Sequence, residues 1–216
     1  MLNIKGVIFD MDGTLLDSMT LWGDVAVRYI KSHGATPRPG FIEALRSLNT
    51  AEEAQYYIDE YGIDLPLEDV IAGRDGMMLE LLVSEVQLKT GVTDVLNTLR
   101  DRGVKICLAT ATDRWLVEPS LDHHGISGYF EHVFTCTEEK TSKKSPDIYI
   151  RAAEFLGTDP SETLVVEDAL YAIETAKKAG FIVAGVYDRV SDDEQGKIKE
   201  LCDHYWISLD EMLLCL

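Results

Sequence analysis

The sequence is short of basic residues, and this shortage limits the partners that the protein can have. It contains 20 Lys and Arg against 38 Asp and Glu, so its formal net charge at pH 7 is −18 and its isoelectric point is about 4.5. Nucleic acids and anionic membrane surfaces bind basic protein faces. We therefore expect no nucleic acid and no membrane as a partner, and a site for an anionic ligand must be built locally.

Long apolar runs and paired cysteines are also missing. No run is long enough to cross a bilayer, and the N-terminus lacks the basic, apolar and small-residue regions of a signal peptide. The four cysteines show no Cys-x-x-Cys spacing, which favours buried free thiols in a reducing compartment. These absences predict a cytoplasmic protein, and we expect it to be a monomer.

The sequence does contain an alternation of strands and helices. Hydrophobic residues make up 46% of the 216 residues, enough for a sizeable core. From Gly91 onward, short apolar runs alternate with amphipathic helical segments, a pattern typical of parallel strands joined by crossover helices. The predicted strands are residues 7–9, 104–110, 131–136, 162–168 and 181–187.

A mostly polar, helical stretch separates the first strand from the others. Its apolar spacing predicts helices over residues 18–32, 41–48, 50–61 and 67–86. The last of these has a weak point at Gly73 and Gly76. The economical interpretation is an α/β, doubly wound parallel-sheet (Rossmann-like) core of residues 1–16 and 90–216. Residues 17–89 would then form an inserted α-helical cap domain that hinges as a mobile lid at its two connections.

Polar residues follow the predicted strands, at the edge of the sheet where open α/β folds bind ligands. The first strand is followed by Asp10 and Asp12, and later strands by Thr110, by Lys143 and by the acidic pair 167–168. Four carboxylates gathered at one edge would repel one another and raise each other's pKa. A hard divalent cation relieves this repulsion, and Mg²⁺ prefers oxygen ligands such as carboxylates. The pattern therefore predicts a Mg²⁺ site that recruits a phosphate group.

The same residues indicate a reaction on a small phosphorylated metabolite. Asp10 lies where its carboxylate could attack phosphorus and form an aspartyl-phosphate. Asp12, two residues on, could protonate the leaving oxygen and then activate water. Gly13 would let the backbone approach and turn, while Lys143, Thr110 and backbone amides would hold the phosphate group.

Four stretches carry a family resemblance. In this order, "DMDGT", "ATAT", "SKKSPD" and "VVED" resemble the signature stretches of the haloacid dehalogenase (HAD) superfamily. The helical insert resembles the cap of its β-phosphoglucomutase-like subfamily. The resemblance implies a nucleophile at Asp10 and a general acid/base at Asp12. The phosphate-binding residues would be Gly13, Thr110, Ala111 and Lys143. The Mg²⁺ ligands would be Asp10, the Asp12 carbonyl, Asp168 and, directly or through water, Glu167.

The lysine stretch departs from the family pattern. That pattern usually reads Gly-Lys-Pro-x-Pro-Asp, whereas residues 142–147 are Ser-Lys-Lys-Ser-Pro-Asp. Counting back from Pro146 assigns the catalytic lysine to Lys143. Because Lys144 stands where the family has proline, a shift by one residue is an open alternative.

Several reactions are compatible with the resemblance. Dehalogenases of this kind lack the second aspartate, so Asp12 argues against them, and the insert gives only weak support for the cap lysine of a phosphonatase. Mutases of the β-phosphoglucomutase type have a histidine where this chain has Trp22 and a lysine where it has Asp113. A mutase also needs a second phosphate-binding group. The insert has thirteen acidic and six basic residues, and its best candidates are Arg46 and Arg74.

We therefore expect a Mg²⁺-dependent phosphatase that hydrolyses a small phosphomonoester through an aspartyl-phosphate intermediate. A sugar-phosphate mutase of the β-phosphoglucomutase type is the alternative, and a non-catalytic phosphate-binding protein is a more remote one. Because every catalytic position is filled, catalysis is favoured over binding alone.

Overall fold

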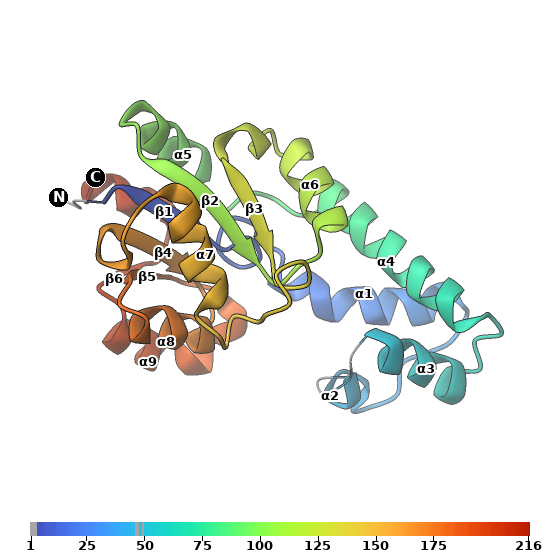
Figure 1. Cartoon of the computed structure of the whole chain (residues 1–216). Coiled ribbons are helices and arrows are strands. Elements are labelled where there is room, and N and C mark those ends of the chain that lie inside the picture. The colour runs from blue at the N-terminus through green and yellow to red at the C-terminus, as the bar shows by residue number, and fades with distance from the viewer. Residues whose placement is uncertain (1–3, 46–47, 49) are drawn as a thin grey trace. The chain divides into compact units, whose positions relative to one another are not determined.

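The structure, a computed structural model, describes residues 4–45, 48 and 50–216. The chain forms two compact units, an α/β unit of Met1–Ser18 with Val86–Leu216 and a helical unit of Met19–Glu85 (Figure 1). Each unit has its own cluster of buried hydrophobic residues.

A six-stranded parallel sheet in the order β3-β2-β1-β4-β5-β6 forms the centre of the α/β unit. The prediction of a doubly wound parallel α/β sheet is therefore confirmed. The strands are β1 Gly6–Phe9, β2 Lys105–Thr110, β3 His132–Thr135, β4 Thr163–Glu167, β5 Ile182–Val186 and β6 His204–Trp206.

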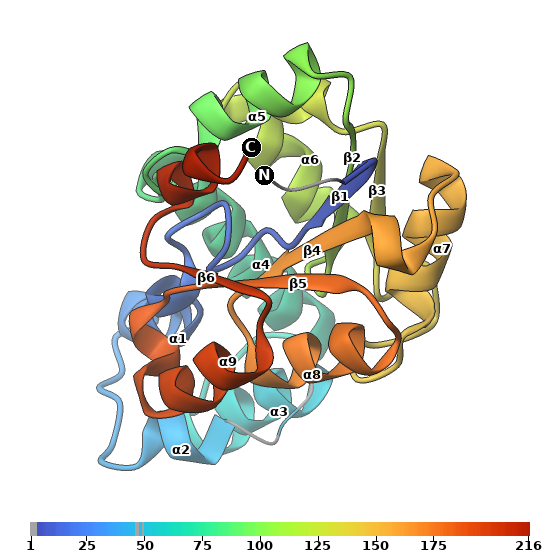
Figure 2. The ribbon, with the colours of Figure 1, turned by 90° about the vertical axis from the view of Figure 1, so that its left-hand side faces the viewer.

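Helices cover both faces of this sheet, which explains why its strands are apolar almost throughout. Ile8, Cys107 and Val165 belong to one core cluster with residues of α7, α8 and α9. Figure 2 shows these three helices on one side of the sheet and α5 and α6 on the other. The helices are α5 Val92–Asp101, α6 Arg114–His123, α7 Asp147–Leu156, α8 Leu170–Lys178 and α9 Gln195–Leu201.

The strand β6 is an addition to the five strands that the sequence predicts. It has three residues and pairs only with β5, at the edge of the sheet. An alternating or continuous apolar pattern needs at least about four residues to be recognised. A strand this short is therefore fixed by its partner and not by its own sequence.

The helical unit is built around a cluster of aromatic rings that are tilted against one another. The ring of Tyr57 lies 5.8 Å from that of Tyr29 and 6.0 Å from that of Phe41, measured between centroids. All three side chains are buried, so this aromatic cluster forms the unit's core. The helices are α1 Met19–Ser32, α2 Phe41–Leu45, α3 Thr50–Tyr61 and α4 Leu67–Ser84.

Two helices of this unit differ from the prediction. Helix α4 continues through Gly73 and Gly76, where the sequence predicts a weak point. A Cβ at position 73 would lie 3.0 Å from the hydroxyl oxygen of Tyr29, so glycine allows α1 and α4 to pack closely. Helix α2 ends at Leu45, and the rest of the helix predicted to residue 48 lies partly outside the described residues.

The two connections to the helical unit pair with each other within the α/β unit. The N–H of Asp17 donates to the carbonyl of Gln87 at 3.0 Å, and the N–H of Lys89 donates to the carbonyl of Leu15 at 2.8 Å. This pairing extends the α/β unit by a few residues at each connection. The compact units consequently divide at Ser18/Met19 and Glu85/Val86, inside the insert of residues 17–89 expected from the sequence.

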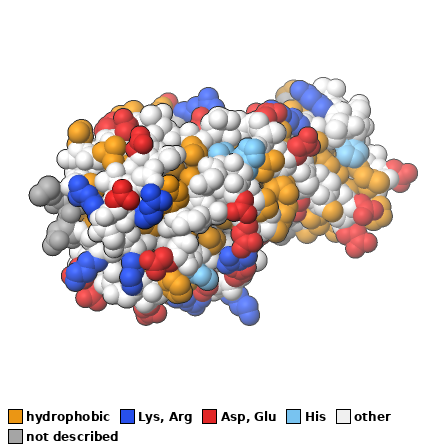
Figure 3. Space-filling view, turned by 90° about the horizontal axis from the view of Figure 1, so that it is seen from above, with side chains coloured by type: hydrophobic (Ala, Val, Ile, Leu, Met, Phe, Trp, Pro, Cys, Tyr) orange, Lys and Arg blue, Asp and Glu red, His pale blue; other side chains and the backbone are white. Residues whose placement is uncertain are grey.

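Three features that the sequence predicts can be compared with the structure: the surface charge, the helices and the cysteines. On the face shown in Figure 3, basic side chains are interspersed with acidic ones. Among the described residues, no helix combines the length and the apolar character needed to cross a lipid bilayer. All four cysteines are free thiols; Cys107 and Cys136 are buried and the other two are half-buried.

Candidate active site

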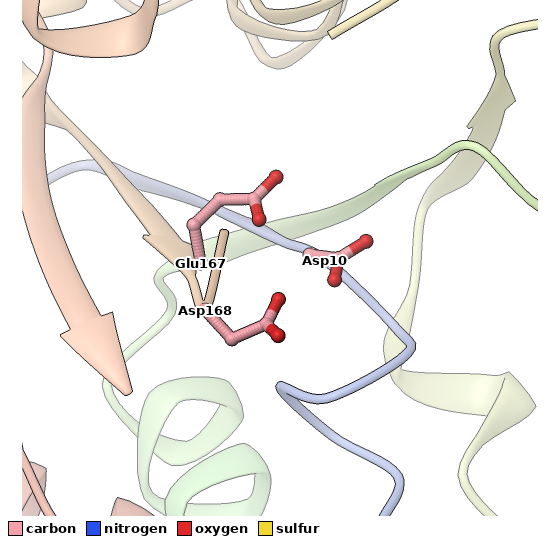
Figure 4. Close-up of side chains that lie close together, drawn as sticks. All are labelled: Asp10, Glu167 and Asp168. Carbon is pink, nitrogen blue, oxygen red and sulfur yellow. The ribbon is translucent and has the colours of Figure 1, made fainter. Parts of the chain in front are cut away.

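Three buried carboxylates lie together at the C-terminal ends of β1 and β4. Phe9, the last residue of β1, pairs with Val166 of β4, and the N–H of Asp10 donates to the Val166 carbonyl at 3.0 Å. This register brings Asp10 level with Glu167. One carboxylate oxygen from each of Asp10, Glu167 and Asp168 lies within 4.8 Å of the others, and all three residues are buried (Figure 4).

Lys143 is the cation of this cluster. Its Nζ donates to the Asp10 carboxylate and, at 2.6 Å, to Oε1 of Glu167, and the residue is only 4% exposed. Lys144 is exposed. Of the two lysines that the sequence leaves open, the fold therefore brings Lys143 to the acidic cluster and Lys144 to the surface.

The cluster contains more acidic groups than basic ones. Burial raises the pKa of Glu167 to about 7, although Lys143 acts in the opposite direction. Burial and then the Asp10 and Glu167 carboxylates raise the pKa of Asp168 well above its usual range. Burial alone would lower the pKa of Lys143, but the two adjacent carboxylates raise it, so the lysine stays protonated. One ammonium group cannot balance all three acids when they are ionised, and the raised pKa values of Glu167 and Asp168 reflect burial together with this repulsion.

Within the described residues, two carboxylate oxygens of the cluster lack a hydrogen-bond partner. They are Oε2 of Glu167 and Oδ2 of Asp168, both fully buried. A buried carboxylate oxygen without a donor is costly. Since hard divalent cations take carboxylate oxygens as ligands, these residues fit a metal site.

Asp12 points to a different set of neighbours. Its Oδ1 accepts a hydrogen bond from the hydroxyl of Ser18 and its Oδ2 one from the hydroxyl of Thr112, each at 2.6 Å. Ser18 and Thr112 are buried, and Asp12 is 9% exposed. Its side chain is therefore held by two hydroxyl groups, while the resemblance assigns only its backbone carbonyl to the metal.

Besides Lys143, the residues expected to bind phosphate lie at the end of β2 and in the loops that follow β1 and β2. Gly13 has a φ of 82°, which favours glycine, and its N–H donates to the carbonyl of Leu16 at 2.9 Å. That donor is therefore engaged within its own loop. The Thr110 side chain is buried and its oxygen accepts the N–H of Thr112 at 3.0 Å, and Ala111 is exposed.

Three residues in contact with the site have no assigned role in the sequence analysis. Ser18 and Thr112 hold Asp12, and Tyr149 of α7 donates a 2.7 Å hydrogen bond to Oε1 of Glu167. Burial and then Glu167 raise the pKa of Tyr149, so its hydroxyl remains a donor. The second hydroxyl residue of "ATAT" is a signal that could have identified Thr112. Tyr149 gives no such signal, because it occupies an ordinary apolar position of a helix.

Arg74, one of the two candidates for a second phosphate-binding group, already pairs with acidic residues. The guanidinium group of Arg74 lies 2.9 Å from the carboxylate of Asp75, 3.6 Å from that of Glu53 and 5.9 Å from the ring centroid of Trp22. Two carboxylates thus neutralise its charge within the helical unit. The other candidate, Arg46, lies outside the described residues.

Comparisons with known proteins identify relatives of this chain. The model of the haloacid dehalogenase-like hydrolase family matches residues 4–180. A candidate phosphatase, YhcW, from Bacillus subtilis (strain 168) is 30% identical over 214 residues, which make up 99% of this chain and 96% of that protein. The fructose-1-phosphate phosphatase YqaB from Escherichia coli (strain K12) is 28% identical over 182 residues, 81% of this chain and 92% of YqaB.

A solved structure of similar fold extends the comparison to the whole chain. A candidate β-phosphoglucomutase from Thermotoga maritima matches with a TM-score of 0.85 and 23% identity, and the match covers 98% of each chain. At this identity the similarity demonstrates a shared fold.

Proposed function

The chain is an enzyme of the haloacid dehalogenase-like hydrolase family, and we propose that it is a Mg²⁺-dependent phosphatase that hydrolyses a small phosphomonoester through an aspartyl-phosphate. The observation that carries the proposal is Asp10, buried at the end of β1 beside Lys143 and two further acids. The relative YqaB, named for its activity on fructose 1-phosphate, supports a small phosphorylated metabolite as substrate.

The proposed first step transfers the phosphoryl group to Asp10. A carboxylate oxygen of Asp10 attacks phosphorus, the bond between phosphorus and the leaving oxygen breaks, and Asp12 gives that oxygen a proton. Ser18 and Thr112 keep the Asp12 carboxyl group in place. Because a hydroxyl can also accept a hydrogen bond, either one can bind the protonated form of Asp12.

The proposed second step regenerates the enzyme. Asp12, now ionised, takes a proton from a water molecule that attacks the phosphorus of the aspartyl-phosphate. The bond between phosphorus and Asp10 breaks, and inorganic phosphate leaves. Throughout both steps, Lys143 balances the negative charge that gathers around Asp10.

The metal would be held by Asp10 and Asp168, with Glu167 as a further ligand and the Asp12 carbonyl as implied by the resemblance. The unpartnered oxygens of Glu167 and Asp168 support this assignment. When bound, Mg²⁺ supplies positive charge that neutralises the phosphate oxygens.

Hydrolysis is preferred over phosphoryl transfer within a sugar phosphate. A mutase must hold a second phosphate group, and Arg74 is already neutralised by Glu53 and Asp75. Asp113, half-buried after the loop that follows β2, would repel a second phosphate. A coupled assay with β-glucose 1-phosphate, primed with glucose 1,6-bisphosphate, compares the two reactions. Mutase turnover faster than phosphate release would contradict the phosphatase proposal.

We further propose the helical unit as the cap of the enzyme, inserted at connections that pair with each other. Structures determined with and without a phosphate mimic would test whether this unit rotates as a rigid body. An identical position in both structures would count against a moving lid.

The direct test of the phosphatase proposal is a phosphate-release screen. The purified chain is incubated with Mg²⁺ and a panel of small phosphomonoesters, with the Asp10→Asn variant as the control. We expect release from at least one sugar phosphate or polyol phosphate by the wild type and none by the variant. Binding of phosphate without release from any compound would favour the non-catalytic alternative.

A further inference from the structure

A single oxygen of Glu167 receives two hydrogen bonds. Oε1 accepts the Nζ of Lys143 at 2.6 Å and the hydroxyl of Tyr149 at 2.7 Å. The other oxygen, Oε2, is buried and has no hydrogen-bond partner in the part of the chain that the structure describes. The carboxylate is therefore asymmetric, because both of its donors occupy one oxygen and the second oxygen is left for another ligand.

Both donors come from one segment of the chain. Lys143 lies in the loop after β3, and Tyr149 lies in the first turn of α7, which begins at Asp147. The two side chains are buried, at 4% and 1% exposure. Lys143 divides its hydrogen bonds between Asp10 and Glu167, whereas the Tyr149 hydroxyl donates its hydrogen bond to Glu167. The ring of Tyr149 is also fixed by its edge-to-face contact with Phe181, at 6.2 Å between centroids. Its rigid hydroxyl thus limits the rotation of the Glu167 carboxylate.

We infer that Tyr149 is a positioning residue that turns the free Oε2 of Glu167 toward the metal site formed with Asp10 and Asp168. This inference rests on the proposed Mg²⁺-dependent function. Hydrogen bonds to a metal ligand fix its orientation, and their removal typically weakens metal binding or activity about 10- to 100-fold. Tyr149 makes no proposed contact with the substrate and acts only through Glu167.

The test uses two matched variants. Tyr149→Phe removes only the hydroxyl group, and Oε1 of Glu167 keeps Lys143 as a donor. Tyr57→Phe is the control, because Tyr57 is also fully buried and its hydroxyl also donates to a glutamate, Glu53 of the helical unit. In both variants a buried tyrosine loses its hydrogen bond to a carboxylate, but only Tyr149 contacts the acidic cluster.

The first readout is the Mg²⁺ concentration that gives half of the maximal increase in melting temperature. We expect Tyr149→Phe to raise this concentration about tenfold and Tyr57→Phe to change it less than about twofold. A Tyr149→Phe midpoint within about twofold of the wild type, or an equal shift in the control, would overturn the inference.

The second readout separates positioning from a general loss of structure. With p-nitrophenyl phosphate, the kcat of Tyr149→Phe should fall at limiting Mg²⁺ and recover at saturating Mg²⁺, with little change in KM. In a Glu167→Gln background, Tyr149→Phe should have no further effect on the Mg²⁺ midpoint, because the two residues act as one unit. A fully additive effect, or a kcat that excess Mg²⁺ does not restore, would contradict the inference.

Failure of the proposed function would look different. A wild type that shows no Mg²⁺-dependent rise in melting temperature and no phosphate release would overturn the phosphatase proposal together with the inference. A wild type that shows both, alongside an unchanged Tyr149→Phe midpoint, would overturn the inference alone.

Discussion

The α/β unit has two groups of charges after neighbouring strands, one buried and one partly buried, and they are built differently. The acidic cluster after β1 and β4 sets three carboxylates against Lys143 and leaves two oxygens without partners. After β5, Asp188 pairs with Lys89 at 2.9 Å. Its other oxygen accepts the N–H of Val190, also at 2.9 Å, and the same ammonium group donates to the carbonyl of Tyr187 at 2.8 Å.

The two groups differ in how completely their charges are paired. The Lys89–Asp188 pair is balanced, and each Asp188 oxygen has a donor. Removing one partner of such a pair strands a buried charge. The acidic cluster is unbalanced by itself, so its residues carry an energetic cost that a bound cation would offset. We therefore expect the unbalanced cluster to bind a ligand and the Lys89–Asp188 pair to stabilise the fold.

The largest effect should follow replacement of the proposed nucleophile. Asp10→Asn keeps the size of the side chain but removes the attacking carboxylate, so phosphate release should fall about a thousandfold or more. The fold should survive, because the change lowers the repulsion in the cluster. Steady-state phosphate release and circular dichroism measure the two outcomes. A variant that keeps a tenth of wild-type turnover would show that Asp10 is not the nucleophile.

Replacement of Lys143 should lower kcat far more than replacement of Lys144. Lys143→Met removes the cation from the acidic cluster and should lower kcat about 100-fold or more. Lys144→Met changes an exposed residue and should leave kcat within about twofold of the wild type. The two kcat values, measured at saturating Mg²⁺, make the comparison. A stronger effect at Lys144 would reverse the assignment of the phosphate-binding lysine.

Loss of the Lys89–Asp188 pair should lower the free energy of unfolding and leave the rate of phosphate release unchanged. Asp188→Ala leaves Lys89, only 14% exposed, without its carboxylate, and should cost about 3 kcal/mol of unfolding free energy. Urea denaturation gives this value. The exposed pair Lys5–Glu162 offers a control, since Glu162→Ala should change the denaturation midpoint little. Equal losses of unfolding free energy in the two variants would mean that the Lys89–Asp188 pair stabilises the fold no more than an exposed pair does.

Removal of the metal should affect the acidic cluster and not the Lys89–Asp188 pair. A chelator should abolish turnover, while Mg²⁺ at a hundredfold excess over its Kd should stabilise the wild type by about 2.7 kcal/mol. Asp168→Ala should weaken this stabilisation. It also relieves repulsion, so we expect its metal-free form to be at least as stable as the metal-free wild type. Thermal melts with Mg²⁺ and with chelator give all of these values, and full activity in excess chelator would refute the metal site.

The sequence alone determined the parallel sheet and the strand ends at which the polar residues gather. Continuous apolar runs such as residues 7–9 predict strands buried on both faces, and the helices between them require parallel connections. The carboxyl ends of parallel strands meet at one edge of the sheet. Asp10, Thr110 and the acidic pair 167–168 could therefore be assigned to one edge from the sequence alone. β6 was missed because three residues carry no periodicity.

Only the tertiary structure decided which side chains meet at that edge. The choice between Lys143 and Lys144 depends on the path of a loop, in which one residue step separates a buried position from an exposed one. Thr112 bonds to Asp12 across 100 positions of sequence, and Tyr149 reaches Glu167 from a helix on one face of the sheet. A sequence pattern reports local burial, but contacts of this kind depend on strand register and helix packing, which arise only when distant segments come together.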